Sequence, residues 1–316
     1  MAPPRSFSRF KARVVEGAKA ASYPGFIPPQ LATLRRQVPS GAQWVHEVKF
    51  DGFRVQAHLV KGRLHLYTRS GLDWTSSFAP VAPDLGRLKA NHAIIDGEVV
   101  SEVEDGRPSF SALQDDLSTG RDDRMLYYAF DLLFLDGFDL RAAKLVDRKT
   151  ILAELIAETR MSRVIYSDHW EEGGEQIYRR ACAEKLEGTI SKLRNAPYRS
   201  ERNEFWIKNK CVQRGTFFVV GFVPKPGGHL GAIRLAKKDG KGLRYIGKAG
   251  TGFTQKSSQE LRKKLEPLAR PTPPVLDRLR KKDTVWIEPK YKAEIEYTEF
   301  TSDGTLRHPS YKGLRA

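Results

Sequence analysis

Short runs of alternating apolar and polar residues, bounded by glycine, aspartate or proline, dominate the first two thirds of the chain. Such runs predict β-strands, and we expect them at residues 44–48, 54–60, 64–68, 93–100 and 127–134. Two segments have helical periodicity instead, residues 147–160 and 175–186, with Asp147 expected as the N-cap of the first. Asp105-Gly106 predicts a hairpin turn. Residues 23–213 are therefore expected to form one domain of mixed strands and helices.

The pattern changes after Cys211. Strands are predicted at 216–222, 231–235, 243–246, 285–288 and 293–300, and one helix, at 255–269, lies between the third and the fourth. Five strands with one intervening helix fit a small OB-type β-barrel, a fold that often binds nucleic acid, although a fold alone does not establish a function. We therefore expect three parts: a basic N-terminal arm (1–22), a mixed domain (23–213) and a barrel (214–316).

Charge is distributed unevenly along the 316 residues, whose net charge is +16. From Gly215 onward there are 21 lysines and arginines against 10 acidic residues, whereas the preceding 214 residues have 33 against 28. This asymmetry indicates a polyanionic partner bound mainly by the C-terminal third; a merely solvated basic surface would spread its charge more evenly. No apolar run approaches the roughly 20 residues that cross a bilayer, so no membrane partner is expected.

The N-terminus and the cysteines bear on location. Residues 1–22 are basic but lack the apolar stretch and cleavage site of a secretory signal, and we expect a disordered arm rather than a transit peptide. Cys182 and Cys211 are too few for a four-cysteine zinc site. Both are interpreted as ordinary thiols in a reducing compartment, which predicts a cytoplasmic protein, in a bacterium the cytosol or nucleoid.

The segment Glu47-Val-Lys49-Phe-Asp51-Gly52-Phe-Arg54 carries the first candidate chemistry. Read structurally, Lys49 and Arg54 are exposed charges beside an Asp-Gly turn. A lysine held between apolar neighbours and near other cations is, however, disfavoured as the ammonium, so its pKa falls and its amine becomes a nucleophile. Lys49 is therefore the candidate nucleophile, although the motif alone occurs in many unrelated proteins.

Further motifs follow Lys49 in a fixed order. They are Arg69-Ser-Gly, Asp96-Gly97-Glu98, Tyr128-Ala-Phe130-Asp131, Glu187-Gly188-Thr-Ile190-Ser-Lys192, Trp206-Ile-Lys208-Asn-Lys210 and the C-terminal Arg307-His-Pro-Ser-Tyr-Lys312-Gly-Leu-Arg315. Together they resemble the covalent nucleotidyltransferases, which comprise ATP-dependent DNA ligases, RNA ligases and mRNA capping enzymes. The resemblance covers the chain after about residue 23 and is strongest to the ligase module of bacterial ligase D, which serves non-homologous end joining.

The resemblance implies an α+β fold: a nucleotidyltransferase (adenylation) domain of antiparallel sheets and helices, followed by an OB-fold barrel. It also implies the reaction. Lys49 would attack the α-phosphate of ATP, release pyrophosphate and carry AMP covalently. The AMP would pass to the 5′-phosphate of a nicked or broken DNA duplex, and the 3′-hydroxyl would then close the break. Such phosphoryl transfer depends chiefly on positioning and on neutralising charge.

The same resemblance assigns roles to individual residues. Glu47 would accept a hydrogen bond from the adenine amino group, and Phe130 and Ile190 would cover the two faces of adenine. Taken alone, Phe130 and Ile190 would simply be core residues. Arg54 and Arg69 would contact the ribose and the 5′-phosphate of the nick.

Phosphate and metal contacts form a second group of expectations. Lys208 and Lys210 alternate along a strand, so both point to one side and suit the α-phosphate; the alternative is a solvated strand face. Lys192 would be a further phosphate contact or a structural ion pair. Glu187 is expected to bind the metal, and Glu98 the metal or the ribose, because Mg²⁺ (or Mn²⁺) favours few protein oxygens together with water and phosphate.

The alternatives within and outside this superfamily remain open. An RNA ligase, a capping guanylyltransferase and a catalytically inactive DNA-binding module are weighed against DNA ligase, while no counterpart of the nicotinamide-recognition domain of NAD-dependent ligases is found. The family usually ends in Arg-x-Asp-Lys, but the sequence stops at Arg315-Ala316. Either the chain has been shortened, or the adenylylation step is weakened or uses Lys312 and Arg315. A monomer is expected, with Ku-type end-joining proteins as partners in trans.

Overall fold

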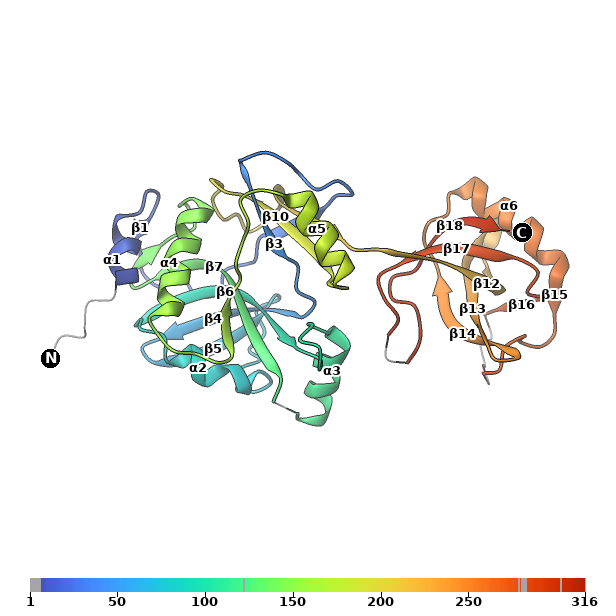
Figure 1. The fold of residues 1–316 in the computed structure, drawn as a ribbon, viewed down its shortest axis with the longest axis horizontal. Helices are drawn as coiled ribbons and strands as arrows, with labels where there is room; N and C mark the ends of the chain where they lie inside the picture. Colours follow the sequence, from blue (N-terminus) through green and yellow to red (C-terminus); the bar gives the residue numbers. More distant parts are fainter. Residues whose placement is uncertain (1–6, 122, 278, 280–282, 302, 316) are drawn as a thin grey trace. The chain divides into compact units, whose positions relative to one another are not determined.

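The computed structural model describes residues 7–121, 123–277, 279, 283–301 and 303–315 (Figure 1). The chain divides into two units, Met1–Cys211 and Val212–Ala316. The boundary predicted between residues 213 and 214 lies two residues beyond this division.

The larger sheet of unit 1 has the strand order β1-β8-β7-β6-β4-β5, with β9 beside β7. Its neighbours are antiparallel except for the β7–β9 pair, which is parallel. The strands are β1 (Lys19–Ala20), β4 (Phe53–Val60), β5 (Arg63–Thr68), β6 (His92–Ser101), β7 (Met125–Leu135), β8 (Phe138–Asp139) and β9 (Val164–Tyr166). Strand β7, Met-Leu-Tyr-Tyr-Ala-Phe-Asp-Leu-Leu-Phe-Leu, is apolar almost throughout because it is covered on both faces.

A smaller sheet has the order β2-β11-β10-β3. Its strands are β2 (Leu31–Leu34), β3 (Trp44–Val48), β10 (Gly188–Leu193) and β11 (Arg202–Lys210). The β10–β11 and β10–β3 pairs are antiparallel, and β2 runs parallel to β11. Ile94, Phe130 and Phe134 of the larger sheet share a core with Trp206 of β11, so the two sheets pack against each other.

Helices cover the other face of the larger sheet. They are α1 (Phe7–Val14), α2 (Ala82–Gly86), α3 (Phe110–Thr119) and α4 (Leu145–Ala157), with the 3₁₀ turn η1 (Ala79–Val81). Helix α5 (Gly174–Ala183) packs instead on the smaller sheet, against β3 and β10. Ile151, Leu152 and Leu155 of α4 fill the main core on the helix-covered face of the larger sheet. Asp147, expected as the N-cap of this helix, instead lies in its first turn, after the N-cap Lys144. Among the described residues, no helix combines the length and the apolar character that a membrane span requires.

The N-terminal segment differs from the disordered arm that its basic composition suggests. Within its described part, α1 packs against α4 through the fully buried Ala12 and an ion pair between Lys11 and Glu154. Strand β1 then pairs with β8. These residues therefore belong to unit 1, because a few well-placed contacts order a segment whose average composition is polar.

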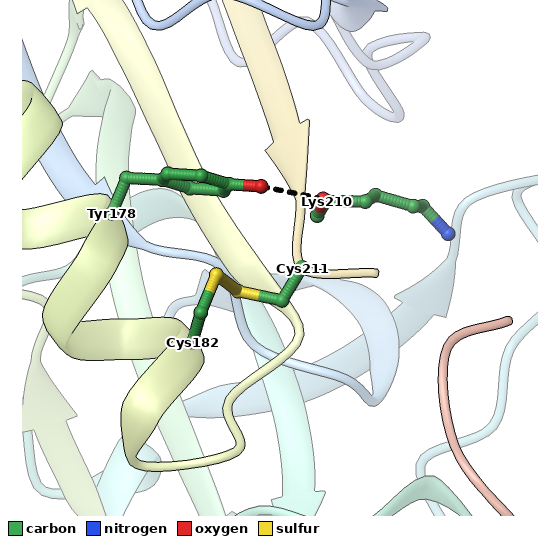
Figure 2. Close-up of a disulfide and its surroundings, with 4 residues drawn as sticks. All are labelled: Tyr178, Cys182, Lys210 and Cys211. Atoms are coloured by element: carbon green, nitrogen blue, oxygen red, sulfur yellow. Dashed lines mark hydrogen bonds between the residues drawn. A yellow bond between two sulfur atoms is a disulfide. The ribbon is translucent and has the colours of Figure 1, made fainter. Parts of the chain in front are cut away.

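The two cysteines correct a second expectation. Cys182 and Cys211 are joined in a disulfide (Figure 2), so they are not free thiols in this structure. The two cysteines are 29 residues apart in the sequence, so the sequence alone does not indicate that they pair. Strand β11 runs back along β10, which places residue 211 beside the end of α5.

Unit 2 is the OB-type barrel that the strand pattern predicts. The long strand β12 pairs through its first half with β17 and through its second half with β13 and β16. Helix α6 lies between β14 and the last strands and buries Leu261 and Leu265 in the barrel core. The elements of unit 2 are β12 (Gln213–Pro224), η2 (Pro226–Gly228), β13 (Leu230–Asp239), β14 (Gly242–Ala249), α6 (Gln255–Leu265), η3 (Glu266–Leu268), β15 (Ala269–Arg270), β16 (Val285–Ile287), β17 (Lys292–Tyr297) and β18 (Ser310–Arg315).

Candidate active site

A cavity of about 670 Å³ is lined by residues of both sheets of unit 1. This volume lies within the usual range for small-molecule sites. Nine residues singled out from the sequence are in its lining: Glu47, Lys49, Arg54, Arg69, Glu98, Phe130, Ile190, Lys192 and Lys208. The remaining two, Glu187 and Lys210, are bound to one another beside Lys49.

Lys49 follows strand β3, at the turn that leads into β4. Its backbone N–H donates to Gly188 O over 2.9 Å, which ties the turn to β10. Gly52 allows this turn to approach β6, because a Cβ at that position would stand 2.1 Å from Val99 O. The Lys49 side chain is 19% exposed, and its Nζ donates to the carboxylate of Glu187. The backbone contacts of this turn thus fix the position of Lys49, whose ammonium lines the cavity and has an acidic partner.

Glu187 holds two lysines at once. Its Oε2 accepts from Lys49, and its Oε1 lies 3.0 Å from Lys210 Nζ. Burial raises the pKa of Glu187, but the charges and hydrogen bonds of the two lysines outweigh burial and leave that pKa below its usual value. The adjacent Gly188 has φ +145°, and a Cβ there would stand 1.9 Å from Asn209 O. Glycine is therefore required where β10 begins against β11.

Lys208 lies two residues before Lys210 on β11 and opposite Ile190 of β10. The two lysines share one side of the strand, as the alternation in sequence predicts. Burial first, and then repulsion by Lys49 and Lys210, lower the pKa of Lys208. A phosphate group would relieve this repulsion, so the cationic edge suits a polyanionic ligand.

Glu98 lies opposite Arg54 in the β4–β6 pair and faces the cavity. Burial raises the pKa of Glu98 to about 8, although the nearby cations Lys49 and Arg54 act in the opposite direction. A carboxyl group with such a pKa, beside a candidate nucleophile, is typical of a functional site.

The guanidinium of Arg54 forms a salt bridge with the buried carboxylate of Asp96. Its Nε and Nη2 donate to the two carboxylate oxygens of Asp96 over 3.0 and 2.6 Å, and its Nη1 donates to Gln30 O. Although burial lowers the pKa of Arg54, the charge of Asp96 reverses the effect and raises that pKa overall. The guanidinium also lies over the rings of Phe130 and Trp206. Arg54 is thus a rigid part of the cavity wall, oriented by Asp96.

Glu47 is 2% exposed and binds two buried lysines. Its carboxylate oxygens lie 2.8 Å from Lys192 Nζ and 3.0 Å from Lys149 Nζ. Burial lowers the pKa of Lys192 to about 8, against the attraction of Glu47. Lys192 also lies over the rings of Phe130 and Trp206, 4.6 and 4.3 Å from their centroids. The Glu47 carboxylate, expected to bind the adenine amino group, is therefore held in position by the two lysines.

The apolar side of the cavity includes Phe130 on β7 and Ile190 on β10. Phe130 is 9% exposed and meets Trp206 edge to face, with ring centroids 6.0 Å apart. Arg69 lines the cavity from the turn after β5 and is exposed. The expected base-covering residues and the expected phosphate contact are thus collected in one cavity from two strands and a turn.

Some residues of the site carry no clear signal in the sequence. Lys149 lies in the middle of α4, and nothing separates it from the other charges of an amphipathic helix. Asp96 and Trp206 fall inside recognised motifs, but the structure adds their function: Asp96 orients Arg54, and Trp206 supports Lys192. The Trp-Ile-Lys-Asn-Lys alternation, which sets Trp206 on the same side as Lys208 and Lys210, is the signal that could have indicated it.

The carboxylates of the cavity bear on metal binding. No group of three or more histidine, cysteine, aspartate or glutamate side chains suited to a metal occurs in the described ranges. Glu98 and Glu187 nevertheless lie near Lys49 and near each other, since Glu98 interacts electrostatically with both Lys49 and Glu187. Two carboxylates fit Mg²⁺, which keeps several water and phosphate ligands.

Comparison with known sequence families gives two matches along the chain. Residues 29–210 match the profile described as "ATP dependent DNA ligase domain". Residues 226–316 match the profile described as "ATP dependent DNA ligase C terminal region". The matches fall within unit 1 and unit 2 respectively.

Curated relatives include the multifunctional non-homologous end joining proteins LigD of Pseudomonas aeruginosa and Mycolicibacterium smegmatis. They are 36% and 33% identical over 300 residues, which is 92% of this chain but only 36% and 39% of the relatives. The chain thus spans little more than a third of their length.

Among solved structures, the ligase domain of M. tuberculosis LigD is 30% identical, with a TM-score of 0.56. A mycobacterial DNA ligase D complexed with ATP and MES is also 30% identical, with a TM-score of 0.55. In both, 91% of this chain and 94% of the other are covered.

Proposed function

The chain belongs to the ATP-dependent DNA ligase family, and we propose that it seals breaks between a 3′-hydroxyl and a 5′-phosphate in duplex DNA through a lysyl-AMP on Lys49. One observation carries this proposal. Lys49 Nζ reaches a cavity of nucleotide size and is held there by Glu187, which also binds Lys210. A nucleophile, a carboxylate and several cations are the groups that adenylyl transfer needs.

We infer that ATP binds in the cavity with adenine between Phe130 and Ile190. Glu47 would accept from the adenine amino group while Lys149 and Lys192 hold its carboxylate in place. The mycobacterial DNA ligase D structure in complex with ATP supports this choice of nucleotide. Arg54, locked by Asp96, would present its remaining surface to the ribose, and Arg69 would meet phosphate at the cavity rim.

The triphosphate would lie against Lys49, Lys208 and Lys210. In the free protein Glu187 neutralises two of these ammonium groups. An incoming phosphate offers Lys210 a second anion, and Lys49 must give up a proton before its amine can attack. Glu187 stabilises the Lys49 ammonium until then, because the nearby carboxyl group of Glu98, with a pKa of about 8, is largely uncharged at neutral pH.

Glu98 and Glu187 are the residues that would hold Mg²⁺ (or Mn²⁺). The metal supplies charge neutralisation at the α-phosphate and the leaving pyrophosphate. The lysines Lys49, Lys208 and Lys210 outnumber the charged carboxylate of Glu187 in the free site, so a triphosphate and its metal ion can enter together without leaving a large net charge.

We assign DNA contacts mainly to unit 2, which carries most of the net positive charge. The names of the LigD relatives support a role in non-homologous end joining. We further propose nicked or broken duplex DNA as substrate and Ku-type proteins as partners, and a monomeric protein of the bacterial cytosol or nucleoid.

The test is label transfer from ATP labelled at the α-phosphate, followed by sealing of a nicked duplex. Wild type should acquire one protein-bound AMP that is stable to alkali and released by acid, as expected of a phosphoramidate, and should seal the nick, whereas Lys49→Ala should do neither. Glu204→Gln, an exposed surface change, provides the matched control. Sealing by Lys49→Ala at the wild-type rate would refute the proposed nucleophile. Sealing of RNA ends at the rate for DNA ends would redirect the proposal to an RNA ligase.

A further inference from the structure

The Cys182–Cys211 disulfide lies where strand β11 leaves unit 1. Cys182 is in the last turn of α5, and Cys211 directly follows β11 and ends the unit (Figure 2). Their Cα atoms are 5.3 Å apart, a separation typical of disulfides. Both residues are half-buried, so the bond is within reach of small reagents. The bond therefore joins a surface helix to the end of a strand that carries site residues.

The loop that this bond closes contains half of the candidate site. Between the two cysteines lie Glu187, Ile190, Lys192, Lys208 and Lys210. A cross-link at the ends of such a loop restricts the positions that its strands can adopt. The link acts on β10 and β11, which pair with each other in register.

Two hydrogen bonds also hold the end of β11 in place, independently of the disulfide. Tyr178 Oη on α5 donates to Lys210 O over 3.1 Å, as Figure 2 shows. The Cys211 N–H donates to Glu187 O over 2.9 Å. Lys210 Nζ in turn lies 3.0 Å from Glu187 Oε1, and the other oxygen of that carboxylate binds Lys49. The disulfide is thus one residue from Lys210 and two contacts from Lys49.

We propose that Cys182 and Cys211 form a redox-modification site, the clasp, that fixes Lys210 against Glu187 and thereby sets the rate of Lys49 adenylylation. This inference rests on the proposed function. With the disulfide formed, the end of β11 is held covalently on α5. With it reduced, the hydrogen bonds of Tyr178 and Cys211 hold that end alone, and Lys210 samples more positions.

The redox step is a thiol–disulfide exchange. A thiolate of a dithiol reductant attacks one cysteine sulfur, and the other leaves as a thiolate; the second thiol of the reductant then displaces the first cysteine. Two electrons and two protons pass to the protein, giving two cysteine thiols and one oxidised reductant. In reverse, hydrogen peroxide accepts two electrons and two protons, gives two waters and restores the disulfide.

The proposed effect, faster adenylylation when the disulfide is formed, agrees with the reducing compartment in which we place the protein. Disulfides in reducing compartments are commonly transient and redox-sensing. The clasp would be open under ordinary cytosolic conditions and would close when oxidants prevail. Oxidants also break DNA, so a clasp that speeds adenylylation when oxidised would raise ligase activity under the conditions that create its substrate.

The experiment compares the two redox states of the full chain. Oxidised protein and protein reduced with dithiothreitol are verified by alkylation, with none and two modified cysteines respectively. Single-turnover labelling by α-labelled ATP is then followed over a range of ATP concentrations. We expect reduction to lower the limiting rate constant roughly threefold to tenfold, with a smaller change in the half-saturating ATP concentration. Hydrogen peroxide should restore the rate in the same sample.

Two variants separate the clasp from other effects of the reductant. Cys182→Ser with Cys211→Ser should have the low rate of reduced wild type and should not respond to dithiothreitol. Tyr178→Phe removes one hydrogen bond beside the disulfide, and it should enlarge the effect of reduction. If the double serine variant fails to fold, the two states of wild type decide the question, because they share one sequence and are checked for equal circular dichroism.

The outcomes are distinguishable. Equal limiting rates for oxidised and reduced wild type would overturn the clasp and leave the proposed function standing. The same would follow if the double serine variant responded to reductant as wild type does. Absence of label in both states would overturn the proposed function and, with it, the role of the clasp in this step.

Discussion

Lys192 Nζ lies 2.8 Å from Oε2 of Glu47, and both side chains are almost entirely shielded from solvent. A third buried ion, Lys149, lies 3.0 Å from the other oxygen of the same carboxylate. One carboxylate therefore faces two buried ammonium groups behind the end of the cavity that we propose to bind adenine. Such a network specifies a geometry, but it leaves the protein vulnerable to loss of its single anion.

Replacing Glu47 by glutamine should destabilise the protein strongly. The variant leaves two lysines buried without a counter-ion, and breaking a buried pair costs roughly 3–5 kcal/mol. The free energy of unfolding, measured by urea denaturation, should fall by that amount.

The exposed pair of Arg35 and Glu204 provides the matched control, because Glu204→Gln should cost less than about 1 kcal/mol. A triple change of Glu47→Leu, Lys149→Met and Lys192→Met should recover part of the lost stability. Equal stability of Glu47→Gln and wild type would show that the lysines have other means of compensation.

The overall fold follows from the sequence where local signals agree with the tertiary contacts. Strands β3 to β7 lie within two residues of the ranges predicted from the sequence, and the residue pattern within them reflects a sheet covered on one or both sides. The two-unit organisation and the barrel are confirmed by the family matches. Helix α3 was not predicted, because its few apolar residues give weak periodicity, although Ser109 caps it. Helix α1 was missed because only its contacts with α4 order it.

The site could be predicted only in part, for a related reason. Motif residues such as Lys49 and Glu98 lie at strand ends or on paired strands, so their types and order in the sequence already indicate the chemistry. Lys149, by contrast, reaches Glu47 from a helix of another layer. Cys182 and Cys211 meet only because β10 and β11 pair in one register. Contacts of this kind depend on tertiary structure and leave no local pattern.

The stability of the protein should depend on pH through Glu98. Its folded-state pKa of about 8 lies above the ordinary value of 4.5. The stabilisation from this group is therefore fully present below pH 4.5 and is lost as pH rises to 8. Glu98→Gln removes that dependence, so the variant should be more stable than wild type at pH 8.5, on the order of 1 kcal/mol.

Near pH 5 the two proteins should converge in free energy of unfolding, because wild-type Glu98 is then protonated in the folded state. Urea denaturation at pH 5, 7 and 8.5 measures the difference. A gap that stays constant over this range would contradict the prediction, because a packing effect alone has no dependence on protonation. Adenylylation should fall in the variant despite its higher stability, since a metal or ribose contact is lost.

Gly188→Ala should damage the site more than an ordinary glycine substitution. Its φ of +145° disfavours alanine, and the added Cβ would collide with Asn209 O. Strands β10 and β11 must separate locally, which moves Glu187 away from Lys49 and Lys210. Single-turnover adenylylation should slow at least about tenfold.

Gly86→Ala is the corresponding control, because no atom lies within 4 Å of the added Cβ. That change should leave adenylylation unaltered and stability equal or slightly higher. If the two alanine variants were adenylylated at the same rate, close approach at Gly188 would not be what holds Glu187 in position.

DNA affinity should depend steeply on salt through cations of unit 2. Lys238 and Lys248 are exposed on the neighbouring strands β13 and β14. Each phosphate contact that is lost should reduce the slope of log affinity against log salt by about 0.9. The double variant Lys238→Gln with Lys248→Gln should therefore flatten that slope by nearly two. Fluorescence anisotropy with a labelled nicked duplex between about 50 and 200 mM salt measures it.

A matched double variant of unit 1 tests whether the position of the lysines or the total charge of the protein determines the salt dependence of DNA binding. Lys61→Gln with Lys89→Gln removes the same charge from exposed positions of the larger unit. Long-range attraction depends on net charge and would weaken equally in both double variants. Counter-ion release depends on contact, so only the unit 2 pair should change the salt slope. Equal changes in both would mean that the excess of basic residues after Gly215 attracts DNA only through the overall field, and that these strands do not form the binding face.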